Sequence, residues 1–315
     1  MHARNLARHG RVRLISVFDV AEQSSRETAL ELGVKLATAV DEIWSDPKVE
    51  AVLIASPTDT HVSLIGTAVA AGKAVLCEKP IDLDLARARA GWAAISARKP
   101  PVMLGFNRRF DPSFRALRER LHAGEIGRLE LVVITSRDPA PPPAAYIMAS
   151  GGLFRDMTIH DFDMARYLAG DIAEVFAFGS SLVDPEIGKL GDIDTCTVTL
   201  KATSGAHIQI NNSRRCSYGY DQRVEAFGSK GMLQAGNARA TAVESWNADR
   251  TASRDPLLNF FIERYRQAYD AEVDAFVAAI ESHSAMTPDF PDGIAALELA
   301  DAAMRSLKSG AAVKL

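Results

Sequence analysis

Residues 51–80 read AVLIASPTDTHVSLIGTAVAAGKAVLCEKP, and this stretch decides the fold class. Its two short runs at residues 51–55 and 74–77 are apolar at successive positions, which is typical of strands covered on both faces of a sheet. The residues between them, 61–71, have a helical pattern that ends at Gly72. A strand, a helix and a second strand in this order predict a parallel strand–helix–strand unit.

The same alternation continues on both sides of this unit. Further strands are predicted at residues 14–18 and 102–106, and further helices at residues 21–32, 41–45 and 83–99. Repeated units of this kind predict a Rossmann-type, doubly wound parallel sheet, which is an α/β fold. Ligands of such sheets bind beyond the carboxyl ends of the strands, so functional residues are expected there.

The pattern changes after Gly127, where alternating segments bounded by turns replace the buried runs. These segments cover residues 129–136, 175–182, 195–201, 207–212 and 222–227. Alternation of this kind predicts an open, mostly antiparallel β-sheet. Two helical patterns close the chain, at residues 260–280 and 293–309. An α+β domain with flanking helices is therefore expected to follow the α/β domain.

The length of 315 residues exceeds that of a usual single domain, so we expect two domains. The first is predicted to cover residues 1–108. The second is predicted to cover residues 109–315, with its carboxyl-terminal helices packing back toward the first domain. Residues 138–143 hold four prolines, which favours a stiff connector over a mobile lid.

Composition argues against several classes of protein. The net charge of −4 and the isoelectric point near 6.0 argue against a nucleic-acid partner, because such proteins usually carry a clustered basic surplus. Cys77, Cys196 and Cys216 are too few and too widely spaced for a disulfide framework or a zinc site. No apolar window reaches the length of a membrane span, so we expect a soluble, cytoplasmic protein.

One part of a dinucleotide-binding domain is missing from the sequence. Such domains open with a strand and a G-x-G-x-x-G turn, whereas residues 1–7 (MHARNLA) have the pattern of the helix that follows this turn. The first strand normally lies in the middle of the sheet, and its loss would leave two neighbouring strands with unpaired backbone groups. A start codon assigned too late, or a shortened chain, is therefore favoured over a protein that has abandoned the pyrophosphate site.

Residues at the predicted strand ends point to a dinucleotide cofactor. Asp19 follows the first predicted strand, where a carboxylate binds the ribose hydroxyls of NAD and would repel the 2'-phosphate of NADP. A lone acid after a strand is a turn residue equally often. Ser56, Pro57 and Thr58 follow the next strand, and His61 opens a helix. Backbone amides at such a helix start can meet phosphate or nicotinamide groups, although an ordinary helix cap explains these residues equally well.

His160, Asp156 and Lys79 carry the groups that oxidation of an alcohol requires. A base must take the hydroxyl proton, a neighbour must orient that base, and a fixed cation must stabilise the developing alkoxide. Asp156 and His160 stand four residues apart in one helical pattern, which puts them on the same helix face. Because no side chain accepts hydride, an organic cofactor is required as well. Taken alone, such a pair is more often a surface ion pair, and it lacks the further ligands that a metal site needs.

Four segments of the sequence stand out as motifs. They are EKP at residues 78–80, GFNRRFD at 105–111, SGGLFRDMTIHDFDMAR at 150–166 and YGYDQR at 218–223. Together they resemble the Gfo/Idh/MocA oxidoreductases, and within that family the inositol 2-dehydrogenases. The likeness covers essentially the whole chain, and the last two segments are the more specific.

This resemblance implies an NAD-dependent oxidation of a cyclic polyol, myo-inositol to 2-keto-myo-inositol, in inositol catabolism. It implies that Lys79 hydrogen-bonds the reacting hydroxyl, that His160 is the general base and that Asp156 supports the proton relay. It also implies a homotetramer assembled through the open face of the second sheet. Contacts to the other substrate hydroxyls are implied for Arg109, Asp163, Tyr218 and Tyr220, and cofactor contacts for Asp19, Ser56, Pro57, Thr58, His61, Glu78, Lys79 and Arg108.

Three alternatives remain open at this point. Tyr218 and Tyr220 are equally compatible with a strand pair facing one side of a sheet. A related sugar or cyclitol dehydrogenase would need only small changes in the pocket. A cofactor-free polyol sensor would explain the absent glycine turn, but it has less need of Lys79, Asp156 and His160.

Overall fold

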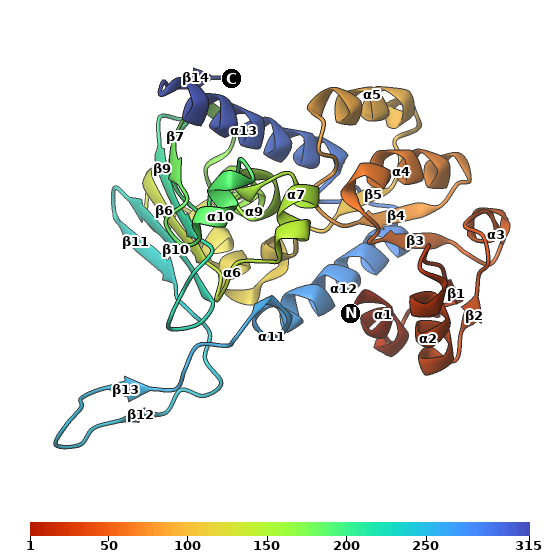
Figure 1. Cartoon of the computed structure of the whole chain (residues 1–315), viewed down its shortest axis with the longest axis horizontal. Coiled ribbons are helices and arrows are strands. Elements are labelled where there is room, and N and C mark those ends of the chain that lie inside the picture. Colours follow the sequence, from red (N-terminus) through yellow and green to blue (C-terminus); the bar gives the residue numbers. More distant parts are fainter. The chain divides into compact units, whose positions relative to one another are not determined.

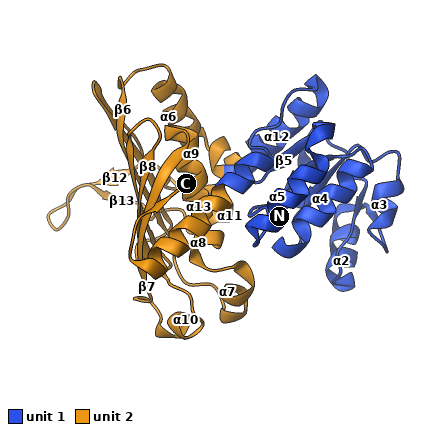
Figure 2. Cartoon of the chain, turned by 90° about the horizontal axis from the view of Figure 1, so that it is seen from above, with its two compact units in different colours: residues 1–107, 269–295 blue, residues 108–268, 296–315 orange.

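The chain divides into two compact units in a computed structural model that describes all 315 residues (Figure 2). Unit 1 combines residues 1–107 with residues 269–295, and unit 2 combines residues 108–268 with residues 296–315. The two long carboxyl-terminal helices, α12 (Arg266–Ser282) and α13 (Phe290–Ser309), therefore each contribute residues to both units.

Unit 1 contains a three-stranded parallel sheet with the strand order β3-β4-β5 (Figure 1). Its strands are β3 (Ala51–Ile54), β4 (Ala74–Cys77) and β5 (Val102–Leu104), and the crossover helices are α4 (His61–Ala70) and α5 (Leu85–Ile95). Every residue of β4 is buried, because this strand has a neighbour on each side. The Rossmann-type parallel sheet predicted from residues 51–80 is confirmed.

A second parallel pair in unit 1 forms a separate sheet, β1 (Ser16–Val17) with β2 (Lys35–Leu36). No backbone ladder joins β1 to β3, and in the usual strand order one strand lies between these two pieces. The strand predicted at residues 14–18 is shorter in the structure, since only the two residues of β2 pair with it. The helices of this part are α1 (His2–Arg8), α2 (Glu22–Leu32) and α3 (Asp41–Ser45).

The start of helix α13 packs into the core of unit 1. The rings of Phe290 and Trp92 stack with their centroids 5.4 Å apart. The backbone amide of Leu104 donates to the carbonyl oxygen of Pro288 over 2.9 Å. Gly293 permits this close approach, because a Cβ atom there would lie 2.2 Å from Leu104 Cδ1.

Unit 2 is built on a seven-stranded sheet with the order β11-β10-β6-β9-β8-β7-β14. The strands are β6 (Leu129–Arg137), β7 (Ile172–Ser180), β8 (Thr195–Ala202), β9 (His207–Ser213), β10 (Asp221–Gly228), β11 (Gly231–Ala235) and β14 (Val313–Lys314). Only β6 and β9 pair in parallel. The mostly antiparallel sheet is confirmed, whereas β11 and β14 were not predicted.

Helices cover one face of this sheet. Along β8, the alternate residues Cys196, Val198, Leu200 and Ala202 are buried. Figures 1 and 2 show helices α6 (Pro112–His122) and α9 (Ile159–Ala169) on the same side, and they contact β11 and β6. The opposite face is open, and its exposed apolar side chains are Phe178, Phe227 and Met232.

The remaining elements of the chain are short. They are helices α7 (Ala144–Ser150), α8 (Leu153–Asp156), α10 (Pro185–Lys189) and α11 (Phe261–Arg264), and the 3₁₀ turns η1 (Thr58–Thr60), η2 (Ser96–Arg98) and η3 (Asn107–Phe110). A hairpin of β12 (Glu244–Ser245) and β13 (Ser253–Arg254) extends away from the large sheet (Figure 1). Residues 138–143 lie in no helix or strand. None of the helices combines the length and the apolar composition needed to cross a lipid bilayer.

Two helices predicted as continuous are each divided in the structure. The pattern that contains Asp156 and His160 forms α8 and α9, because the amide of Thr158 bonds the carbonyl of Leu153, five residues earlier, and the regular ladder is interrupted. The prediction of one helix at residues 260–280 is also wrong, since Tyr265 separates α11 from α12. In both cases the interruption coincides with a buried side chain that hydrogen-bonds to the sheet, which local periodicity does not reveal.

Candidate active site

Two neighbouring parallel strands of unit 1 end beside predicted cofactor residues. β3 is followed by Ser56, Pro57 and Thr58, and β4 is followed by Glu78 and Lys79. The last residues of β3 and β4 are paired in register, so these loops leave the same edge of the sheet. The carboxyl edge of a parallel sheet is where such folds bind ligands, and the structure brings these five residues to it.

His61 connects the two loops at this edge. It is buried, with Nδ1 2.8 Å from the carbonyl oxygen of Pro80 and Nε2 2.9 Å from that of Ser56. The imidazole thus holds the loops after β3 and β4 together. A direct contact between His61 and the cofactor stays a prediction.

Asp19 lies two residues after the end of β1 and is exposed. One carboxylate oxygen, Oδ1, accepts a hydrogen bond of 2.9 Å from the amide of Ala21. The next side chain, Val20, is 88% exposed and carries no charge that would pair with a phosphate. The carboxylate therefore stands at a strand end with its second oxygen available to a hydroxyl donor, which fits a ribose without a 2'-phosphate.

Glu78 is held in place beside the strand end. Its Oε1 lies 2.7 Å from His2 Nε2, and its Oε2 accepts from the amide of Lys79 over 3.1 Å. Burial acts to raise the pKa of Glu78, but the bonds from His2 and Lys79 outweigh it and hold the pKa below its ordinary value. Gly105 packs against this side chain, since a Cβ atom there would lie 3.1 Å from Oε2. Glu78 is thus an ionised residue of the loop and not a proton donor at neutral pH.

Glu272 on α12 is another buried carboxyl group of unit 1, and it was not among the site residues predicted from the sequence. It is 1% exposed, and its Oε1 has no hydrogen-bond partner. Burial raises its pKa well above the ordinary value, and the negative charge of Glu78 adds to this effect. Burial therefore favours the protonated form of Glu272 in the folded protein.

The protonation of Glu272 makes folding sensitive to pH. The unfolded chain releases this proton above about pH 4.3, whereas the folded chain keeps it, so stability should fall as the pH rises from there toward the folded-state pKa. The Glu272→Gln variant has no such proton to lose, so its stability should not fall in this way. The difference in melting temperature, variant minus unmodified protein, should therefore rise steadily with pH. Calorimetry at several pH values measures this, with Asp270→Asn, an exposed site on the same helix, as the control. Parallel melting curves for the two proteins would contradict the assignment.

In unit 2, a glycine turn sets the position of Asp156. Gly151 and Gly152 have φ angles of 81° and 86°, which residues with side chains rarely adopt. The amide of Leu153 then donates to Asp192 Oδ1 over 3.1 Å and starts α8. A Cβ atom on Gly152 would lie 2.7 Å from that oxygen, so the turn and the carboxylate fit together only with glycine.

Asp156 and His160 keep a helical relation although two helices carry them. Met157 and Thr158, between the helices, have right-handed helical backbone angles, so the two side chains remain about one turn apart. Both are half-buried. Asp156 Oδ1 accepts from the hydroxyl of Tyr146 over 2.9 Å, and Asp156 Oδ2 accepts from Arg214 Nη1 over 3.1 Å. Asp156 is thus supported by α7 and by the turn after β9.

A buried polar network anchors the first turn of α9 to the sheet. Asp161 Oδ1 accepts from Ser136 Oγ and from Arg108 Nη1, each over 2.6 Å, and its Oδ2 accepts from Asn212 Nδ2 over 2.7 Å. Thr158 Oγ1 donates to Asn212 Oδ1 over 2.6 Å. These side chains are all at least nine-tenths buried. The network holds the helix that carries His160 in place. In the sequence, the polar run NNS at residues 211–213 is the one signal that could have indicated such a network.

Arg108 and Arg109, neighbours in η3, pair with two different aspartates of α9. Arg108, a predicted cofactor contact, is buried and paired with Asp161. Arg109 binds Asp163 through two parallel hydrogen bonds, Nε to Oδ2 over 2.8 Å and Nη2 to Oδ1 over 2.6 Å. The two predicted substrate residues Arg109 and Asp163 are therefore brought together as one ion pair, which fixes both side chains.

Tyr218 and Tyr220 have different surroundings. Tyr218 is 52% exposed; its hydroxyl donates to Asp221 Oδ2 over 2.6 Å and accepts from Arg137 Nη1 over 2.7 Å. Tyr220 is buried, with its ring centroid 5.5 Å from that of Phe260. Both precede β10, so the alternative of a strand pair facing one side of the sheet is wrong. Their predicted substrate contacts remain untested.

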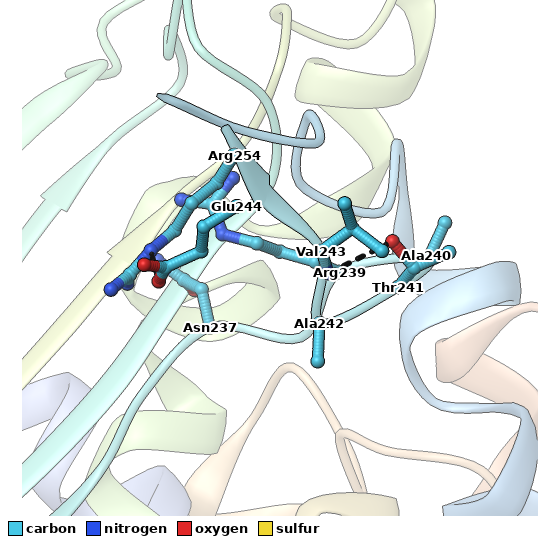
Figure 3. A pocket seen from close by; sticks show the side chains of 8 residues that line it. All are labelled: Asn237, Arg239, Ala240, Thr241, Ala242, Val243, Glu244 and Arg254. Carbon is cyan, nitrogen blue, oxygen red and sulfur yellow. Dashed lines mark hydrogen bonds and ion pairs between the residues drawn. The ribbon is translucent and has the colours of Figure 1, made fainter. Parts of the chain in front are cut away.

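A hollow of about 450 Å³ lies at the base of the β12–β13 hairpin (Figure 3). Arg254 and Glu244 form an ion pair on one side of it, and Arg239 and Thr241 line it as well. None of the predicted site residues lines this hollow, so it is distinct from the candidate active site. No group of three or more metal-ligating side chains is present in the structure.

Sequence profiles match both units. A profile described as "Oxidoreductase family, NAD-binding Rossmann fold" matches residues 1–106, and one described as "GFO/IDH/MocA C-terminal domain" matches residues 114–234. The chain is 47% identical over 308 residues to an inositol 2-dehydrogenase of Rhizobium meliloti, covering 98% of this chain and 93% of that relative. It is also 47% identical over 320 residues to a myo-inositol 2-dehydrogenase of Thermotoga maritima, covering 100% of this chain and 95% of the relative.

Solved structures agree with the sequence relatives. A myo-inositol dehydrogenase from Corynebacterium glutamicum superposes with a TM-score of 0.96 at 48% identity, covering 100% of this chain and 94% of that one. A scyllo-inositol dehydrogenase from Lactobacillus casei, with bound NAD(H) and scyllo-inositol, superposes with a TM-score of 0.92 at 30% identity, covering 99% of this chain and 94% of that one.

Proposed function

The chain belongs to the GFO/IDH/MocA family of NAD-binding oxidoreductases, and from this premise we propose that it oxidises the axial hydroxyl of myo-inositol to a ketone. The product is 2-keto-myo-inositol, and NAD takes the hydride released from the carbon. The near full-length identity with inositol 2-dehydrogenases carries this proposal. In this proposal the reaction takes place in the cytoplasm and is a step of inositol catabolism.

His160 is the proposed general base. The hydroxyl proton of the substrate moves to its imidazole as the carbon–hydrogen bond breaks. Asp156, one turn earlier, orients the imidazole and stabilises its charged form. Two features support this role: Asp156 is fixed by Tyr146 and Arg214, and the buried network around Asp161 holds the first turn of α9.

Lys79 is the proposed electrostatic partner of the reacting oxygen. Its ammonium group donates a hydrogen bond to the hydroxyl and stabilises the negative charge that develops on it. Its place two residues after the end of β4, at the carboxyl edge of the parallel sheet, supports this role.

The cofactor is assigned to residues that follow the parallel strands. Asp19 would accept hydrogen bonds from the adenosine ribose. The loop formed by Ser56, Pro57 and Thr58, with Glu78 and Lys79 beside it, would hold the nicotinamide part. His61, as a loop connector, and Arg108 complete the proposed cofactor set.

The polyol is assigned to Arg109, Asp163, Tyr218 and Tyr220. A ring with many hydroxyls needs both donors and acceptors around it, and these side chains supply both. The paired Arg109 and Asp163 would present a fixed surface to the ring, because each holds the other in place.

A panel of polyols tests the proposed function. Purified protein is mixed with NAD or NADP and with myo-inositol, scyllo-inositol, other cyclitols or sugars, and the reduced cofactor is followed by absorbance. We expect the highest kcat/KM with myo-inositol and NAD, and a rate at least about tenfold lower with NADP because Asp19 repels its phosphate. A higher kcat/KM with a sugar or another cyclitol would favour a related dehydrogenase. A protein that binds a polyol but neither oxidises it nor binds NAD would favour the sensor.

We also propose a homotetramer formed through the open face of the unit 2 sheet. The exposed Phe178, Phe227 and Met232 on this face support it, because exposed apolar side chains that share one face are typical of interfaces. Light scattering of the purified protein measures the assembly, and a monomer at micromolar concentration would contradict it.

A further inference from the structure

Arg214 is a buried cation beside Asp156. It follows β9 and is 1% exposed, and its backbone amide donates to the carbonyl of Asp194 over 2.8 Å. Its Nη1 lies 3.1 Å from Asp156 Oδ2, and this is its only ion pair. Its Nε and Nη2 have no hydrogen-bond partner. The positive charge of this buried guanidinium group is therefore balanced by one carboxylate, that of Asp156.

Two other buried arginines of unit 2 have more hydrogen bonds than Arg214, whereas Arg264 resembles it in having one bond, to Asp111. Arg109 binds Asp163 through two parallel bonds, and Arg108 bonds both Asp161 and Ser136. The single bond of Arg214 therefore makes an incomplete ion pair in a region that excludes water. Burying a charge with so few partners is costly, and a protein built only for stability would fill this space with apolar side chains.

The Asp156 carboxylate accepts hydrogen bonds from groups of more than one element. Arg214 occupies its Oδ2, and Tyr146 from α7 donates to its Oδ1. His160 follows one turn later on α9. Asp192, whose Oδ1 accepts from the first amide of α8, is another negative group near this turn. Arg214 is a cation bonded directly to the Asp156 carboxylate within unit 2.

We propose that Arg214 is a positioning residue for the oxidation: it keeps the Asp156 carboxylate ionised and aimed, so that Asp156 can orient the imidazole of His160. This inference rests on the proposed function, because it gives Asp156 and His160 their roles. Arg214 acts through Asp156 and does not touch the substrate, since its side chain has almost no exposed surface.

The sign of the expected pH effect follows from the charges. Removing Arg214 takes away the positive charge that is bonded to Asp156 Oδ2, while the bond of the neutral donor Tyr146 to Oδ1 is kept. Both Asp156 and His160 then bind protons more readily, because a positive neighbour is gone. The acidic limb of kcat/KM against pH should therefore move to higher pH.

Arg214→Met tests the inference in the active protein. kcat and KM for myo-inositol are measured at saturating NAD between about pH 5.5 and about pH 9. We expect kcat at pH 7 to fall about thirtyfold, KM to change less than about threefold, and the acidic limb to rise by about one pH unit. Arg214→Lys, which keeps the charge, should restore the position of the limb. Arg215→Met, the same substitution at the exposed neighbouring site, is the matched control and should behave as the unmodified protein.

Two kinetic results would overturn the inference. One is an unshifted pH profile in Arg214→Met, which would make Arg214 a purely structural residue. The other is a rise in KM with kcat unchanged, which would make it a substrate contact. If the unmodified protein oxidises myo-inositol and Arg214→Met equals Arg215→Met, the inference fails while the proposed function stands.

Thermal unfolding tests the ion pair without any activity. Asp156→Asn leaves the buried guanidinium without its anion, whereas the double variant Asp156→Asn with Arg214→Met removes both charges. We expect Asp156→Asn to lower the melting temperature more than the double variant does, because an unpaired buried charge costs more than a missing pair. If the melting temperature of the double variant falls by the sum of the two single-variant decreases, the two residues are not coupled and the inference is refuted. This result would hold even if no polyol is oxidised.

Discussion

Replacing His160 with alanine is expected to lower kcat/KM for myo-inositol oxidation by at least about a hundredfold while the protein stays folded. The reason is that the imidazole is the proposed acceptor of the hydroxyl proton. Lys79→Ala should cause a loss of similar size, at least about a hundredfold, because the charge on the reacting oxygen then lacks its fixed cation. Steady-state kinetics with NAD and myo-inositol measure both losses.

The controls for these two variants differ. For His160, the matched control is His122→Ala, which removes an exposed imidazole at the end of α6 and should leave kcat/KM unchanged. For Lys79, the affinity for NAD must be measured as well, since the same residue is assigned to the cofactor. Circular dichroism and melting temperatures confirm folding. Rates close to those of the unmodified protein in either variant would refute the corresponding role.

Replacing Asp161 with alanine is expected to lower the free energy of unfolding by about 3–5 kcal/mol, the usual loss when one partner of a buried ion pair is removed. Asp161 is fully buried, and its loss leaves the guanidinium of Arg108 without its carboxylate in the interior. Asn212 and Ser136 lose a partner as well. Because this network anchors the first turn of α9, turnover should fall along with stability.

Denaturant unfolding measures the loss in Asp161→Ala. The control is Asp171→Ala, which breaks an exposed pair with Arg166 and should cost at most about 1 kcal/mol. The double variant Asp161→Ala with Arg108→Met should recover part of the stability, since it also removes the unpaired charge. A loss in Asp161→Ala no larger than that in Asp171→Ala would show that the network contributes little.

The fold was largely predictable because its signals are local. The runs at residues 51–55 and 74–77 are apolar at every position, and this pattern arises wherever a parallel strand is covered on both faces. The alternation in β8 and β9 indicated a sheet with one open face in the same way. Elements without such patterns were missed: β11 is only five residues long, and β2 and β14 only two each.

The candidate site was predictable only in part. Asp156 and His160 are four residues apart, so the helical repeat alone brings them together. Arg214 is separated from Asp156 by 58 residues, and Arg108 from Asp161 by 53. No periodicity relates such residues, because their contacts arise only when α8 and α9 pack on the sheet.

The sequence by itself determined the fold class, the family and the residue types of the proposed reaction, since hydrophobic period and short motifs are properties of neighbouring positions. Only the tertiary structure decided that residues 269–295 complete unit 1, that Arg109 pairs with Asp163, and that Arg214 supports Asp156. The physical reason is desolvation. A buried charge is tolerated only with a partner, and packing chooses that partner from anywhere along the chain.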